Sequence, residues 1–155
     1  MPGDFFHLIA GSALSLSRYR VSLGSNVSVT ANTTTAVMSQ IVIMPSGGGP
    51  FRALIVYDGA IVNGTTNGAN VALWVSDATN NFAEAYVGML SSATIGTLGF
   101  EGSGISTVTY SNGASVTFTL EVNSTQNATI DAALPGGTGT PSLSTHMDIL
   151  VFPSN

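Results

Sequence analysis

His146 and Asp148 are the residues of this sequence whose types and spacing come nearest to a catalytic pair. They stand two positions apart in a segment whose alternation predicts a β-strand, so both side chains would lie on one face. A carboxylate in this position can orient an imidazole for general-base catalysis. No G-x-S-x-G motif supplies a nucleophile, however, and a polar patch near a strand end explains the same two residues. We predict that the protein is not an enzyme and has no catalytic residue.

Metal and cofactor sites are also predicted to be absent. Asp58, Asn63 and Asn67 would offer oxygen ligands to a calcium ion from one glycine-rich connection, but turn formation accounts for the same residue types. Two histidines and no cysteine fall short of the ligand density of a zinc motif. Glycines 47–49 are followed by neither a Lys-Ser/Thr pair nor a predicted helix, so they do not match a phosphate-binding loop.

The charge content of the chain is unusually low. Only 7% of its 155 residues are charged, against about 25% in an ordinary soluble domain. The three cations are all arginines, at positions 18, 20 and 52, and lysine is absent. Binding to a phosphate backbone needs a basic stripe that releases counterions, and a chain with a net charge of −5 offers none. We therefore predict no nucleic-acid partner.

The length and hydropathy of the chain indicate one domain that does not insert into a membrane. A chain of 155 residues can bury a hydrophobic core of its own. No stretch approaches 18 uninterrupted apolar residues, so no transmembrane helix is expected. The opening residues carry Asp4 where a secretory signal has basic residues, and we interpret them as part of the mature protein.

Alternation of apolar and polar residues recurs along the chain and predicts an all-β fold. It is clearest over residues 115–122, and Asn-Gly, Asp-Gly and Pro-Gly-Gly turn signals separate the segments. The predicted strands cover residues 5–10, 19–30, 36–44, 51–62, 70–76, 82–90, 105–110, 115–122, 128–134 and 145–152. Segment 82–90 is also compatible with a short helical turn. We predict a single antiparallel β-sandwich or jelly roll of about eight to ten strands over residues 1–155.

Two further structural predictions concern pairing. Segments 51–62 and 70–76 are joined by a connection rich in Gly, Asn and Thr, which predicts a hairpin with Trp74 packed in the core. Strands without lysine also lack the charges that normally keep sheet edges from pairing with other chains. We expect the edges to be closed or covered by neighbouring subunits.

A possible interface lies near the start of the chain. Arg18, Tyr19 and Arg20 follow an apolar stretch that contains Phe5 and Phe6. Arginine and aromatic side chains are favoured anchors of interfaces, so these five residues are predicted to contact a partner. An ordinary strand with alternate residues exposed explains the triplet equally well. Segment 1–20 is interpreted as an attachment or subunit-exchange arm.

The loops NGTTNGAN and LPGGTGTPSLST, the closing STHMDILVFPSN and strands rich in Ser, Thr, Asn and Gly resemble virion structural proteins of tailed bacteriophages. The resemblance is to jelly-roll capsid cement (decoration) proteins and fibre-tip domains. The ending is also similar to the last strand of trimeric jelly rolls of the complement and tumour-necrosis-factor type, with Met147, Ile149 and Val151 alternating inward.

This resemblance implies a homotrimeric β-sandwich on the outer surface of a virion, with the major capsid protein or other virion proteins as partners. A cement protein that stabilises the phage head is favoured, because the sequence lacks the coiled-coil or shaft segment by which fibre tips attach.

Two alternatives stay open. A tail-fibre or baseplate tip would bind surface glycans through Tyr57, Trp74, Tyr86 or Tyr110 and neighbouring Asn and Asp side chains. A small polysaccharide depolymerase would need two of the eight acidic residues in one cleft.

Overall fold

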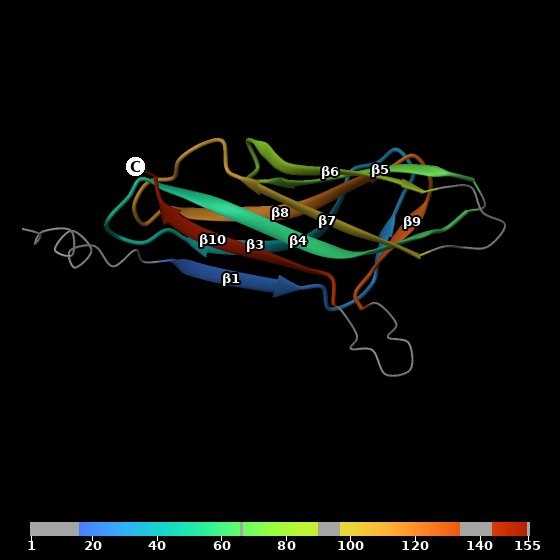
Figure 1. The fold of residues 1–155 in the computed structure, drawn as a ribbon, viewed down its shortest axis with the longest axis horizontal. Helices are drawn as coiled ribbons and strands as arrows, with labels where there is room; N and C mark the ends of the chain where they lie inside the picture. Colours follow the sequence, from blue (N-terminus) through green and yellow to red (C-terminus); the bar gives the residue numbers. More distant parts are fainter. Residues whose placement is uncertain (1–15, 66, 90–96, 134–143, 155) are drawn as a thin grey trace, which may run out of the picture.

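The computed structural model describes residues 16–65, 67–89, 97–133 and 144–154, which form ten β-strands and no helix (Figure 1). The strands are β1 (Ser17–Ser22), β2 (Val27–Val29), β3 (Thr35–Ile43), β4 (Phe51–Asn63), β5 (Ala69–Ser76), β6 (Asn81–Met89), β7 (Thr97–Ile105), β8 (Ser115–Ser124), β9 (Ala128–Asp131) and β10 (His146–Pro153). Every strand pair is antiparallel. The predicted all-β class is confirmed.

The strands lie in two sheets with jelly-roll order. One edge of the long strand β4 pairs with β10 and then with β9, while its other edge pairs with β7. With β1 beyond β10 and β2 beyond β9, the first sheet runs β1-β10-β4-β7 over most of its length. The second sheet has the order β3-β8-β5-β6. Between β3 and β8 every connection except that from β5 to β6 joins one layer to the other, as in a jelly roll.

The predicted strand 19–30 is interrupted between β1 and β2. At the same level β9 ends at Asp131 and β10 begins at His146. Asn26 holds this gap, because its side chain donates to Asp131 Oδ1 at 3.0 Å and accepts from the Ala132 amide at 2.8 Å. Leu23 N donates to the Thr145 carbonyl at 2.9 Å on the other side of the gap. The two broken strands therefore remain side by side.

Tyr57 lies at the centre of the core. Its side chain is fully buried in the first sheet, and its hydroxyl donates to the carbonyl of Ala83 in the second sheet at 2.6 Å. Burial raises the pKa of Tyr57 because the charged form would lose its hydration. The ring also faces Phe100, at 6.3 Å between centroids. This one side chain thus joins the two layers by both packing and a hydrogen bond.

The predicted hairpin of segments 51–62 and 70–76 is wrong. β4 and β5 belong to different sheets, so they face one another across the core instead of pairing. Trp74 is not in the core either. Its neighbours Leu73 and Val75 point inward and are fully buried, so alternation turns Trp74 to the outer face of the second sheet, where it is half-buried.

The strand predicted over residues 105–110 is also wrong. The actual strand, β7, ends at Ile105, and Tyr110 forms only an isolated bridge with Phe51. The sequence TLGFEGSGI of β7 contains three glycines, which ordinarily disfavour strands. Segment 82–90 corresponds to strand β6 and not to a helical turn. The predicted strand 5–10 lies outside the described residues.

The outer edge of β3 is partly covered within the chain itself. The Met44 amide donates to the Ala114 carbonyl on the β8 side, so the backbone groups of Ile43 point away from the sheet. There the Ile43 carbonyl accepts the Tyr19 hydroxyl at 3.0 Å, and the Ile41 carbonyl accepts the Gln40 side-chain amide at 2.7 Å. Side-chain hydrogen bonds thus occupy carbonyl groups on an edge strand that has no charged side chains to prevent pairing with another chain.

The glycine at position 102 should be essential for the core. A methyl group there would overlap the ring of Tyr57, which pairs with Gly102 across β4 and β7. We expect Gly102→Ala to lower the free energy of unfolding by about 2 kcal/mol through overpacking. Gly99→Ala on the same strand is the control, because a methyl group there makes only an ordinary contact. Urea unfolding measures both variants, and equal losses would contradict this account of β7.

Candidate functional site

The strongest ionic interaction in the described residues lies on the outer face of the first sheet. Asp148 accepts bidentate hydrogen bonds from Arg20, at 2.8 and 2.6 Å, and from Arg18, at 3.2 Å for both contacts. The side chain of Asp148 is only 11% exposed, whereas those of Arg18 and Arg20 are 60% and 52% exposed. β1 and β10 pair so that Arg20 lies directly opposite Asp148. We call these three residues and His146 the Asp148 cluster.

The two guanidinium groups control the ionisation of Asp148. Hydrogen bonds from Arg20 hold the pKa of this carboxyl well below its usual range, and those from Arg18 act in the same direction against the opposing effect of burial. The hydrogen bond with Asp148 in turn raises the pKa of Arg20. Asp148 is therefore a fixed negative charge, permanently paired, and is unsuited to the exchange of protons.

His146 lies beside this carboxylate, as the strand spacing predicted. Its Nε2 atom is 3.6 Å from Asp148 Oδ2 and 3.2 Å from a terminal nitrogen of Arg20. Its Nδ1 atom is 2.8 Å from Asp58 Oδ1 and 2.9 Å from the carbonyl of Ser144. Within the described residues no hydroxyl group is hydrogen-bonded to the ring, so no nucleophile accompanies it. This arrangement stabilises a charged patch and does not resemble a hydrolytic triad.

The residues considered for calcium do not come together. Asp58 lies within β4, on the outer face, whereas Asn63 ends the same strand with a side chain that is 3% exposed. The Asn63 side chain donates to the Asn67 carbonyl at 2.7 Å and accepts from the Thr65 amide at 3.1 Å. These bonds form a turn and use the oxygen that a cation would need. No cluster of three or more metal-ligating side chains occurs in the described parts of the chain.

An apolar surface crosses the outer face of the first sheet beside the Asp148 cluster. Its central members alternate with the fully buried Ala53 and Ile55, so they point outward. Leu54 pairs with Leu150 on one side and with Ile105 on the other. We call the whole set the apolar band. It consists of Leu16, Leu54, Val56, Ile105, Leu150 and Phe152.

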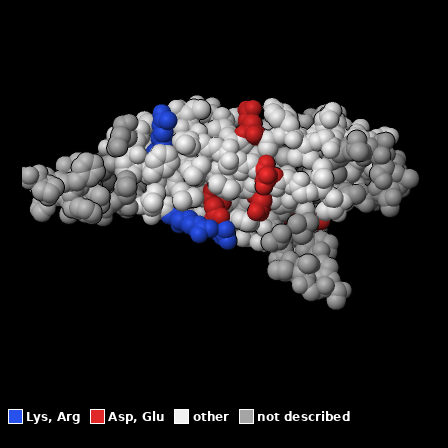
Figure 2. All heavy atoms as spheres, viewed as in Figure 1, with Lys and Arg blue, Asp and Glu red and all other residues white. Residues whose placement is uncertain are grey.

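The apolar band is genuinely accessible. Val56 is 43% exposed, Ile105 50% and Leu16 61%. At its border the Nε atom of Arg52 is buried without a hydrogen-bond partner among the described groups. Figure 2 shows cationic side chains along the side where β1 runs, next to acidic ones, and a second cationic group apart from them, while most of the remaining described surface carries neither. The sequence analysis missed this band, although the apolar residues at consecutive positions 53–56 and 149–152 signal strand segments that are apolar on both faces.

The predicted interface residues are only partly brought together. Arg18 and Arg20 point outward, whereas Tyr19 turns inward and packs against the core. Phe5 and Phe6 lie outside the described residues. Residues 17–20 of the predicted arm belong to β1 and are paired with β10. An attachment role for the segment before them stays a prediction.

The four aromatic residues considered for glycan binding also separate. Tyr57 is fully buried, and Tyr110 is 9% exposed and donates its hydroxyl to Asp77 Oδ2 at 2.8 Å. Tyr86, in contrast, is 78% exposed on the outer face of the second sheet. Trp74 lies on that same face and donates its indole N–H to Glu121 Oε2 at 2.6 Å. Only Trp74 and Tyr86 are therefore available to a ligand.

No protein-family model and no curated protein matches the sequence. Among solved structures, a mutant VP2 protein of infectious bursal disease virus in T=1 particles aligns with 90% of this chain at 10% identity, with a TM-score of 0.44. The VP2 subviral particle of the same virus aligns over 90% of the chain with the same identity and TM-score. The chain spans 36% and 33% of those two proteins, about a third of their length. Both are proteins of this virus and not of a tailed bacteriophage.

In the described residues there is no helix long and apolar enough to cross a membrane.

Asp148 should contribute to stability in a pH-dependent manner. Because its pKa is lowered by folding, its contribution is complete above the usual value of about 3.8 and decreases as the pH falls from there towards the lowered pKa. We expect Asp148→Asn to cost about 2 kcal/mol at pH 7, as charged hydrogen bonds are lost, and much less at pH 2.5.

Urea unfolding at both pH values measures this difference. Glu101→Gln is the matched control, since Glu101 is exposed on the same face. We expect it to change stability by less than about 0.5 kcal/mol. An Asp148→Asn effect that is the same at both pH values would contradict the ionic role.

Proposed function

We propose that this protein is a non-enzymatic structural component of a virion, a capsid decoration (cement) protein that acts as a homotrimer. The observation that carries the proposal is the apolar band on the outer face of the first sheet. The sequence resemblance to jelly-roll cement proteins and to trimeric jelly rolls supports the same function.

The apolar band has the composition of an interface centre. Contiguous exposed apolar side chains are uncommon on monomeric surfaces and favour association, because burying them releases water. The Asp148 cluster borders the band, as charged residues border the apolar centres of many interfaces.

Attachment to the particle is assigned to a part of the chain outside the apolar band, namely the residues before Leu16. β1 forms one edge of the first sheet. The residues that precede it in the sequence include Phe5 and Phe6, which are suited to contact a capsid shell. A trimer joined through the apolar bands would present three such segments, and three weak contacts would bind the shell with high avidity. Binding of this kind would stabilise the shell against internal pressure.

The apolar band is tested by placing a charge in it. Val56→Lys and Ile105→Lys alter exposed positions, so the fold should persist, but a cation would have to be buried on association. We expect each to raise the dissociation constant of the trimer at least about a hundredfold. Sedimentation equilibrium measures the change.

Ile41→Lys serves as the control, since Ile41 is 60% exposed on the outer face of the other sheet. It should leave the trimer intact. A wild-type protein that is monomeric at micromolar concentration, or equal behaviour of all three variants, would refute association through the apolar band.

The particle role is tested on virions that lack the protein. A cement protein should be located on the head, and its loss should lower the temperature at which particles release their genome. Location on the tail together with unchanged heat stability would favour the second candidate, a receptor-binding tip, for which Tyr86 and Trp74 on one outer face are the supporting observation.

A further inference from the structure

We propose that the outer face of the second sheet binds a neutral sugar unit of a glycan, in a shallow depression between Tyr86 and Asn123. The proposal concerns the sheet opposite the apolar band. It rests on residues separate from the apolar band, so it holds or fails independently of the homotrimer and of the cement role, whereas Tyr86 and Trp74 also support the receptor-binding candidate.

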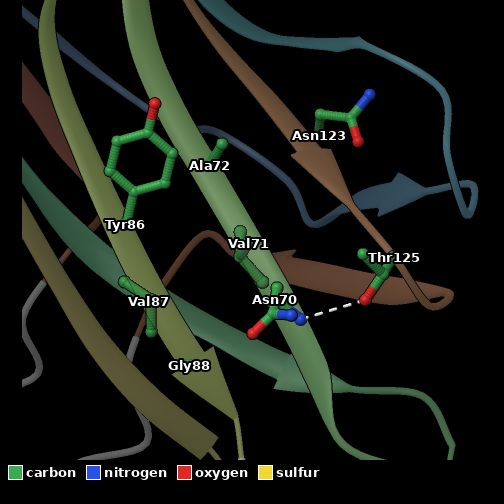
Figure 3. A pocket seen from close by; sticks show the side chains of 8 residues that line it. All are labelled: Asn70, Val71, Ala72, Tyr86, Val87, Gly88, Asn123 and Thr125. Atoms are coloured by element: carbon green, nitrogen blue, oxygen red, sulfur yellow. Dashed lines mark hydrogen bonds between the residues drawn. The ribbon is translucent and has the colours of Figure 1, made fainter.

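The depression exists because a small residue lies between two larger ones (Figure 3). Ala72 of β5 pairs with Tyr86 of β6 on one side and with Asn123 of β8 on the other. Its methyl group forms the floor, while the flanking side chains rise as walls. The hollow has a volume of ≈330 Å³, at the lower end of the range of about 300–1,000 Å³ typical of ligand sites.

The exposure of Tyr86 points to a ligand with a flat apolar face. Tyr86 is 78% exposed, although tyrosines in folded proteins usually bury much of their surface. A pyranose ring has one face made of C–H groups, which can lie against an aromatic ring and remove both surfaces from water. Trp74 lies two positions from Ala72 on the same face, outside the lining of the depression, and its hydrogen bond to Glu121 fixes the indole there.

The polar groups around the depression suit hydroxyl groups. Asn70 and Asn123 offer amides that both donate and accept, and within the described residues the Asn123 side chain has no hydrogen-bond partner. The Asn70 backbone amide donates to Thr125 Oγ1 at 3.0 Å, which fixes that hydroxyl at the rim. A sugar, with a hydroxyl on almost every carbon, can bond to both kinds of group.

The charges near the depression exclude acidic sugars. All three arginines belong to strands of the first sheet, two to β1 and one to β4. The second sheet instead carries Glu84 and Glu121 beside Tyr86 and Trp74. A sialylated or sulfated sugar would meet carboxylates and no cation, so the site should prefer neutral sugars.

Tryptophan fluorescence provides the binding assay, because Trp74 is the only tryptophan of the chain and lies two positions from Ala72, the floor of the depression. The probes are neutral tetrasaccharides of glucose, galactose, mannose and N-acetylglucosamine, with sialyllactose as the acidic comparison. We expect at least one neutral probe to change the emission with saturation at millimolar or lower concentration, and sialyllactose to bind more weakly.

Three variants locate the site. Ala72→Leu fills the floor without removing any wall, and Tyr86→Ala removes the stacking ring, so each should weaken binding at least about tenfold. Tyr86→Phe keeps the ring and should remain within about threefold of the wild type. Thr117 lies on β8 opposite Ile41 of β3, on the same outer face, and Thr117→Ala is the control that should bind normally. Far-ultraviolet circular dichroism checks that each variant is folded.

Several outcomes would overturn the proposal. These are no response to any neutral probe, a preference for sialyllactose, or binding that survives both Ala72→Leu and Tyr86→Ala. If Ala72→Leu instead changed the mass of the protein in solution, the depression would be a contact between copies of the chain and not a sugar site.

Discussion

The burial of Tyr57 between the two sheets is the constraint on which much of this structure depends. Its ring occupies the space where β7 would otherwise place a side chain, so β7 carries Gly102 at that level. Its hydroxyl bonds to the carbonyl of Ala83, a residue with a φ of 54° at an irregularity in the β5–β6 pairing. One buried phenol thereby determines the composition of one strand and the local course of another.

This constraint also explains which parts of the fold were predictable. β8 was predicted because Phe118 and Leu120 alternate with polar residues on a half-exposed strand. β7 was not predicted over residues 97–105. Its Gly102 is required by the ring of Tyr57 on the neighbouring strand β4, and the local sequence does not show this contact. The error over β4 and β5 has a similar origin. Strands that follow one another in the sequence often pair within one sheet. The same apolar faces can also pack against one another from opposite sheets, across the core.

The site residues show the same division. The shared face of His146 and Asp148 followed from strand periodicity alone. The partners that decide their chemistry, Arg20 and Asp58, come from β1 and β4 and are set by long-range strand pairing. The exposure of Tyr86 and the burial of Tyr57 could not be predicted either, since residue type does not tell which face of a strand a tyrosine occupies. Residue type indicated the candidate site residues. Which of them are accessible depends on the sheet to which each strand belongs and on the face that each side chain occupies.

The gap between β9 and β10 has a consequence for the plasticity of the chain. Beyond the ends of the two strands, the Thr145 amide donates to the Ala132 carbonyl, and Ala133 and Ser144 are joined by a β-bridge at the two stems. Because the stems are adjacent and Asn26 holds the sheet together behind them, the length of the connection is not set by the sheet. Changes of sequence and length between β9 and β10 should therefore be tolerated, and a foreign peptide grafted there should leave the two sheets unaltered.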